Sequence, residues 1–213
     1  ESLVAKESMG LYNDGKTPGL LNTILHEAAH NLGPAHEYAY QGKTATAAFG
    51  GNLAAMLEEL KAQCGALYFL QLLKKKGVID DKVVVQTYLD GVVWAFGHVS
   101  RGMYDARGGR KAYSQLAAIH LGFLMDEGAL TYDPSAPAAN GTDKGAFKLA
   151  YDKFPAAAEK LMKVVATIKA TNDKAGADAL AKRYVDGPTV PQAVITERLT
   201  RNPRSSFIYA HEM

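Results

Sequence analysis

The sequence has one cysteine, almost no net charge and no long apolar run, and each shortage excludes a class of protein. With Cys64 alone, no disulfide can form within the chain, so the fold must be stabilised by its core. The balance of 24 basic and 22 acidic residues is too even for a nucleic-acid partner or an acidic membrane surface. No apolar run approaches the roughly 20 residues that span a bilayer, so a membrane protein is not expected.

What is present fits an ordinary globular domain. The 213 residues, 47% hydrophobic and 22% charged, are enough to bury a core without disulfides or structural metals. No internal repeat or domain boundary is apparent in the sequence. One helical domain over residues 1–213 is therefore predicted. The chain begins at Glu1 without an initiator methionine, so we expect it to be a C-terminal fragment of a longer protein. The compartment, cytoplasm or periplasm, stays open.

Helical periodicity runs through nearly the whole sequence and predicts a mainly α fold. Pro18 is placed to open the first helix, and Gly33-Pro34 to end it. Residues 131–145, which include Pro134, Pro137 and Gly141, are interpreted as a loop, and the tail from Gly187 as irregular with an extended segment at 205–210. Helices are predicted over 18–32, 51–76, 81–104, 110–128, 155–171 and 172–185.

The stretch LHEAAHNLGPAHE, residues 25–37, contains the pattern of a metal site. His26 and His30 are four residues apart, so their rings project from the same face of a helix and can reach one Zn²⁺. Glu27, beside the first histidine, is placed to act as a general base on water. The alternative is a solvated polar face, since one side of this helix is apolar: Leu20, Leu21, Ile24, Leu25, Ala28 and Leu32.

The next helix offers a third ligand. Glu58 and Glu59 lie outside its main apolar stripe, yet Glu59 is flanked by small and apolar residues, with Gln63 one turn further on. Such a surface favours another helix packing closely against it, and a buried carboxylate there is rare unless it is paired or metal-bound. Glu59 with the two histidines would give a His₂Glu site with one position open, which is typical of catalytic zinc.

The spacing of the motif is also compatible with a different third ligand, His36. His26 to His36, with Gly33 between them, matches the His₃ pattern of metzincin endopeptidases. Such an enzyme needs a methionine turn below the metal, for which Met103 is the candidate. It also carries a sheet ahead of the active helix, and only 25 residues precede His26.

Longer stretches resemble the dipeptidyl-peptidase III family of zinc metallopeptidases. EELKAQCGALYFL (58–70) is similar to the family's glutamate-pair motif. AYSQLAAIHLGFLMDEGAL (112–130) is similar to the helix that carries a catalytic histidine, and KLMKVVATIKATNDKAGADALAKRY (160–184) to a later helix-turn-helix. The resemblance covers most of the chain in the right order and implies the helical zinc lobe, with the active site between two adjacent helices.

The resemblance also implies roles for individual residues. It makes His26, His30 and Glu59 the ligands of one zinc per chain and Glu27 the general base. Glu58 and Gln63 would orient ligands from behind, and His120 would donate to the developing oxyanion. The implied reaction releases dipeptides from the N-termini of short peptides. In the family a second, partly β-barrel lobe precedes this one and supplies much of the cleft, so we expect the isolated chain to bind zinc with little or no activity.

The sequence departs from the family pattern in three places. The histidine motif has five residues where most of the family has six, Gln63 stands where a glutamate is usual, and Phe123 and Leu124 occupy the region of a missing arginine. These departures keep a second hypothesis open, a helical binding module that has lost catalysis. His36 is expected to line the cleft or cap the loop after Gly33, unless it is the metzincin ligand or an exposed surface residue.

Overall fold

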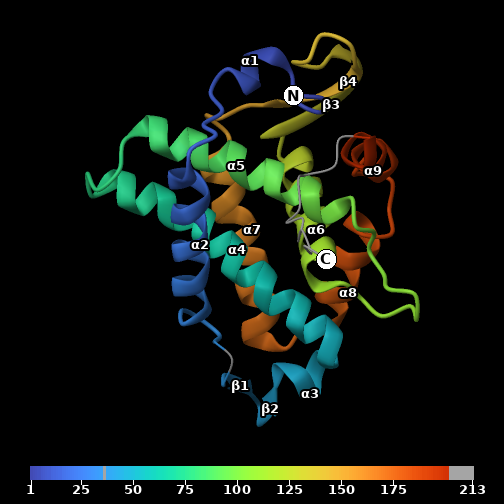
Figure 1. The fold of residues 1–213 in the computed structure, drawn as a ribbon. Helices are drawn as coiled ribbons and strands as arrows, with labels where there is room; N and C mark the ends of the chain where they lie inside the picture. The colour runs from blue at the N-terminus through green and yellow to red at the C-terminus, as the bar shows by residue number, and fades with distance from the viewer. Residues whose placement is uncertain (36, 202–213) are drawn as a thin grey trace, which may run out of the picture.

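The computed structural model describes residues 1–35 and 37–201, and this part of the chain is mainly α (Figure 1). The short helices are α1 (Lys6–Met9) and α3 (Ala45–Phe49). The long ones are α2 (Lys16–His30), α4 (Gly51–Lys75), α5 (Asp81–Val99), α6 (Ala112–Asp126), α7 (Phe154–Thr171), α8 (Lys174–Tyr184) and α9 (Gln192–Arg201). The strands are β1 (Ala39–Tyr40), β2 (Lys43–Thr44), β3 (Leu130–Pro137) and β4 (Lys144–Leu149). None of the described helices has the length and apolar character needed to cross a membrane.

Helix α4 forms the centre of the bundle. It is packed against four other helices, α2, α5, α6 and α7, and Figure 1 shows α4 in the middle of this group. Its predicted apolar stripe is buried, and so are residues on its other faces, among them the polar Glu58, Lys61 and Gln63. A helix buried all round can present polar side chains only to its neighbours, so these three must find partners within the bundle.

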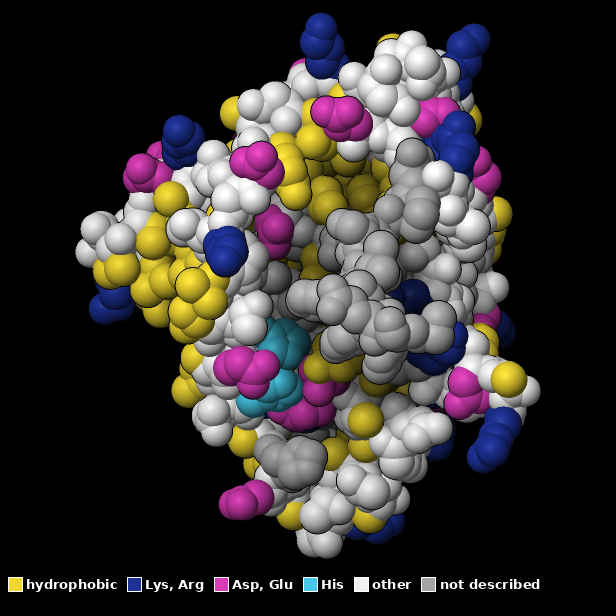
Figure 2. Space-filling view, viewed as in Figure 1, with side chains coloured by type: hydrophobic (Ala, Val, Ile, Leu, Met, Phe, Trp, Pro, Cys, Tyr) yellow, Lys and Arg dark blue, Asp and Glu magenta, His cyan; other side chains and the backbone are white. Residues whose placement is uncertain are grey.

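Helix α2 turns its polar face toward α4. Asn22 and His26 are only 7% exposed, whereas Leu20 is 59% and Ile24 55% exposed. Figure 2 shows hydrophobic side chains at the surface in this region. The interpretation of the histidine face as solvated is therefore wrong, and much of the apolar arc of this helix faces outward instead.

A close contact between small residues sets the distance from α2 to α4. Gly65 on α4 faces Ala29 on α2, and a Cβ atom added to Gly65 would lie 2.8 Å from the Cβ of Ala29. A contact this short leaves no space for a side chain at position 65. The absence of one lets the two helices approach closely in the turn next to the histidines.

Residues 131–145 are not the predicted loop. β3 and β4 form an antiparallel hairpin in which Leu130 pairs with Leu149 and Tyr132 with Phe147. The register shifts between Asp133 and Pro137, which accommodates the prolines that suggested irregular chain. The buried Phe147 anchors the hairpin to the core.

The end of the described chain also differs from prediction. The helix from Phe154 to Thr171 and the short helix after it occur as predicted, but a further helix, α9, follows Pro191. Its Arg198 joins the ends of the fold by donating to the backbone oxygens of Ser2 and Lys144. The predicted extended segment at 205–210 lies outside the described residues.

The Gly65 contact can be tested by adding one methyl group. Gly65→Ala should destabilise the protein, because overpacking costs about 1–3 kcal/mol and exceeds the roughly 1 kcal/mol that alanine gains in a helix. Gly91→Ala is the matched control, since its Cβ would meet its nearest neighbours at an ordinary 3.9 Å. Urea unfolding of the metal-free protein should show a loss for the first and a small gain for the second. Equal effects would contradict a tight α2–α4 contact.

Candidate metal centre

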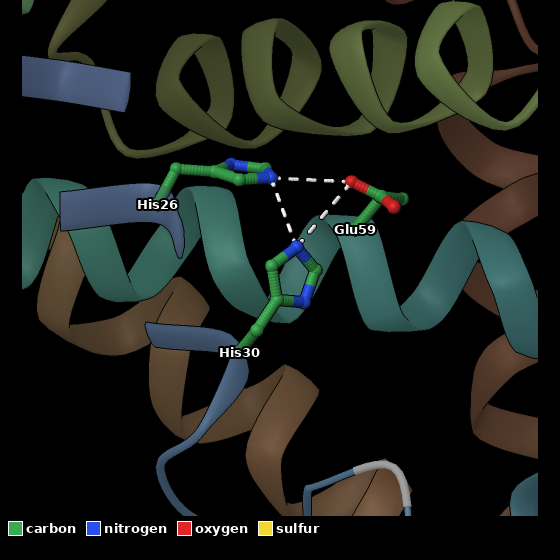
Figure 3. A group of neighbouring side chains, drawn as sticks. All are labelled: His26, His30 and Glu59. Carbon is green, nitrogen blue, oxygen red and sulfur yellow. Dashed lines mark hydrogen bonds and ion pairs between the residues drawn. The ribbon is translucent and has the colours of Figure 1, made fainter. Parts of the chain in front are cut away.

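Three side chains from α2 and α4 converge on one point (Figure 3). The Nε2 atoms of His26 and His30 are 3.2 Å apart. The Oε2 atom of Glu59 lies 3.1 Å from the first and 3.7 Å from the second. The i, i+4 spacing on α2 and the α2–α4 contact thus bring together the three residues predicted as ligands.

The protonation of the two rings follows from their outer contacts. Nδ1 of His26 is 3.2 Å from the Oε1 atom of Gln63, and Nδ1 of His30 is 2.8 Å from the Oε1 atom of Glu58. Amide and carboxylate oxygens only accept, so in neutral rings both Nδ1 atoms carry the hydrogen. Both Nε2 atoms then direct lone pairs toward the Glu59 oxygen.

Three lone-pair donors facing one another need a cation between them. Ligands about 2.0–2.1 Å from a tetrahedral zinc are separated by about 3.3 Å, and the three separations here, 3.1, 3.2 and 3.7 Å, lie on either side of that value. The donor set and its spacing therefore fit zinc. Burial opposes the charged form of His26, but its hydrogen bonds to Glu59 and Gln63 outweigh this and raise its pKa, as expected where a proton replaces a metal.

Behind His30, Glu58 is held by two lysines. Lys61 and Lys169 both contact its carboxylate, and Lys61 also donates to the backbone oxygens of His30 and Leu32 at the end of α2. Burial disfavours the ionised Glu58, but the bonds from Lys169, His30 and Lys61 outweigh it and lower its pKa to about 2. Glu58 thus stays an anion that fixes the His30 ring.

Behind His26, the partner is neutral. Gln63 accepts from His26, and its amide nitrogen donates to the Oδ1 atom of Asn22 at 3.4 Å. This second bond fixes which end of the amide faces the histidine. The glutamine at this position therefore supplies orientation without charge.

A cavity of about 350 Å³ opens beside the centre, and its lining includes His26, Glu27 and Gln63 as well as the aromatic Tyr12, Trp94 and Tyr113. Figure 2 shows histidine and acidic side chains at the surface where Figure 1 places the end of α2. Glu27 is exposed and borders both the cavity and the ligand His26. The predicted general base is thus beside the metal centre and open to a substrate.

His120, the predicted oxyanion donor, is enclosed in the core of the bundle. It is 1% exposed in the middle of α6, and neither ring nitrogen has a hydrogen-bond partner among the described residues. Burial lowers its pKa to about 4, so the ring is neutral. It is not among the residues that line the cavity beside the ligands, and its assignment as the donor to an oxyanion stays a prediction.

Two other predicted features have different outcomes. His36 lies outside the described residues, so its assignments to the cleft, to a cap or to a metzincin site stay predictions. Met103 is buried, and its backbone oxygen accepts from Gln115, an ordinary structural contact.

Tyr113 and Lys169 belong to the centre but were missed from the sequence. Lys169 had a weak signal, because it falls on the buried face of α7 four residues after Val165. Tyr113 had none, since α6 is apolar on most sides and its pattern does not indicate which residue faces another helix.

Comparison with solved structures identifies the fold. The chain superposes on dipeptidyl-peptidase III from Caldithrix abyssi with a TM-score of 0.75 and 22% identity, over 93% of this chain and 34% of that one. With the enzyme from Corallococcus sp. strain EGB the TM-score is 0.76 and the identity 23%, over 94% and 34%. The sequence matches no protein-family model and none of the curated proteins.

These matches confirm the resemblance at the level of the fold. The chain spans about a third of the length of either structure, as expected of one lobe of a larger molecule. The fold of this chain is therefore similar to that of part of each dipeptidyl-peptidase III structure.

The Glu58–Lys169 pair can be tested by removing the lysine. Lys169→Met should destabilise the metal-free protein by roughly 3 kcal/mol, because it leaves a buried carboxylate with one lysine instead of two. Lys163→Met on the same helix removes an exposed pair with Glu159 and should cost less than about 0.5 kcal/mol. Urea unfolding measures the loss of stability in both variants. Similar small losses would show that Lys169 is not needed to stabilise the buried Glu58 carboxylate.

The third ligand can be identified by single replacements. Glu59→Ala should weaken zinc binding by more than about 100-fold, beyond the 10–100-fold typical of an outer partner. Glu127→Ala, a remote carboxylate that pairs with Lys160, is the control and should have no effect. Zinc affinity is measured by competition with a chelating dye. A large loss with His36→Ala and none with Glu59→Ala would instead establish the metzincin arrangement.

Proposed function

We propose that this chain is the zinc-binding lobe of a metallopeptidase that hydrolyses peptide bonds. The observation that supports this most directly is the convergence of His26, His30 and Glu59 beside a cavity that Glu27 also borders. A structural zinc site would have four protein ligands, whereas this group has three and an adjoining space. One zinc per chain is the cofactor we infer.

The proposed chemistry assigns a task to each side chain. Bound zinc would supply a Lewis acid that polarises the scissile carbonyl and acidifies water. Glu27 takes a proton from the attacking water as the new C–O bond forms, and returns it to the amine nitrogen as the C–N bond breaks. Glu58 and Gln63 hold the two imidazoles in the orientation that keeps their Nε2 lone pairs directed at one point.

The substrate class rests on the similarity to the two dipeptidyl-peptidase III structures. We infer release of dipeptides from the N-termini of short peptides, with a further lobe of the same protein, N-terminal to this chain, supplying the opposite wall of the cleft. The open cavity beside Glu27 is consistent with a site that lacks such a wall. On its own the chain is expected to bind zinc and to turn over peptide weakly or not at all.

Metal analysis of the purified protein tests the proposal. We expect about one zinc per chain at neutral pH, lost when His26 and His30 are both replaced by alanine. In the longest natural polypeptide that contains this chain, Glu27→Gln should retain zinc and abolish release of dipeptides from a dipeptidyl arylamide. Protein that binds no zinc at neutral pH would refute the proposal.

A non-catalytic binding module is the second candidate. The burial of His120 favours it, because the residue expected to stabilise the transition state is enclosed in the core and does not line the cavity beside the ligands. Zinc bound without turnover in the longer polypeptide would support this candidate.

A further inference from the structure

Each histidine of the metal centre has a hydrogen-bond partner behind it, and the carboxylate has one too. Gln63 accepts from His26, and Glu58 accepts from His30. The side chain of Tyr113, in the first turn of α6, lies within hydrogen-bonding reach of Glu59. The three ligands are thus oriented by residues on two helices, α4 and α6.

The bond to Tyr113 has a defined direction. An ionised carboxylate can only accept, and in neutral rings the Nε2 atoms beside Glu59 present lone pairs, so the phenol supplies the hydrogen. Desolvation and the nearby Glu59 raise the pKa of Tyr113 to about 12, so the hydroxyl keeps its proton at neutral pH. A bond from a hydroxyl to a carboxylate is charge-assisted and stronger than one between neutral groups.

The Tyr113 ring is itself held in place. It lies 5.4 Å from the ring of His98 and 6.3 Å, edge to face, from that of Trp94. The rings of Trp94 and His98, both on α5, are in contact with their centroids 4.3 Å apart and their planes tilted by 48°. Although 43% exposed, the tyrosine is therefore positioned by packing as well as by its hydroxyl.

We propose that Tyr113 is a positioning residue for the metal centre, holding the Glu59 carboxylate in the orientation that faces His26 and His30. This inference rests on the proposed zinc site. It means that α6 contacts the metal centre through Tyr113 in its first turn, whereas His120, further along the same helix, is buried.

The test removes only the hydroxyl. Tyr113→Phe keeps the ring contacts and should weaken zinc binding by about 10–100-fold, the usual effect of losing an outer partner of a ligand. With cobalt in place of zinc, the visible absorption spectrum should change, because it reports the geometry of the ligands directly. Tyr104→Phe is the matched control, since that tyrosine is 40% exposed and donates to Asp186 at 2.6 Å, away from the metal ligands.

A double replacement separates positioning from a general structural effect. If Tyr113 acts through Glu59, Tyr113→Phe should cost no further affinity in a Glu59→Gln background. An equal loss in both backgrounds, as a folding defect would give, overturns the inference. So does unchanged affinity and an unchanged cobalt spectrum in Tyr113→Phe. Failure of the unmodified chain to bind zinc would instead refute the proposed function itself.

Discussion

The close approach of α2 and α4 is the constraint on which the metal centre depends. All three candidate ligands come from these two helices, and no loop contributes one among the residues that the structure describes. Because Gly65 faces Ala29 without a side chain between them, the helix backbones fix where the imidazoles and the carboxylate can meet. Ligand geometry is therefore determined by rigid elements, an arrangement that holds side chains more precisely than loops do.

The orientation of α2 shows that polar contacts outweigh apolar burial at this site. Leu20 and Ile24 remain in contact with solvent, at a cost of about 25 cal/mol for each Å² of apolar surface left exposed. In return Asn22 and His26 are buried and hydrogen-bonded to Gln63. A helix that loses hydrophobic stabilisation in order to bury a hydrogen-bonded network is characteristic of a functional site.

Sequence reasoning succeeded where spacing along one helix determined the outcome. The i, i+4 histidines, together with the resemblance of residues 58–70 to a zinc-peptidase motif, predicted the three residues whose ligand atoms lie within 4.8 Å of one another. It failed where the answer depended on how helices dock. The pattern of α6 could not show that Tyr113 borders the cavity while His120 is buried, because the helix is apolar on most sides. In residues 131–145 the prolines indicated a loop, but the segment forms a hairpin. Cross-strand packing of Tyr132 on Phe147 stabilises it, and a shift in register accommodates the prolines.

Lys169 lies 111 residues beyond Glu58, the carboxylate that it neutralises. During synthesis, α2 and α4, which carry the three candidate ligands, emerge from the ribosome before α7. Until α7 docks, Glu58 has only Lys61 and His30 to balance its charge. The electrostatic setting of the metal centre is therefore completed late in synthesis, and the same docking closes the core over α4.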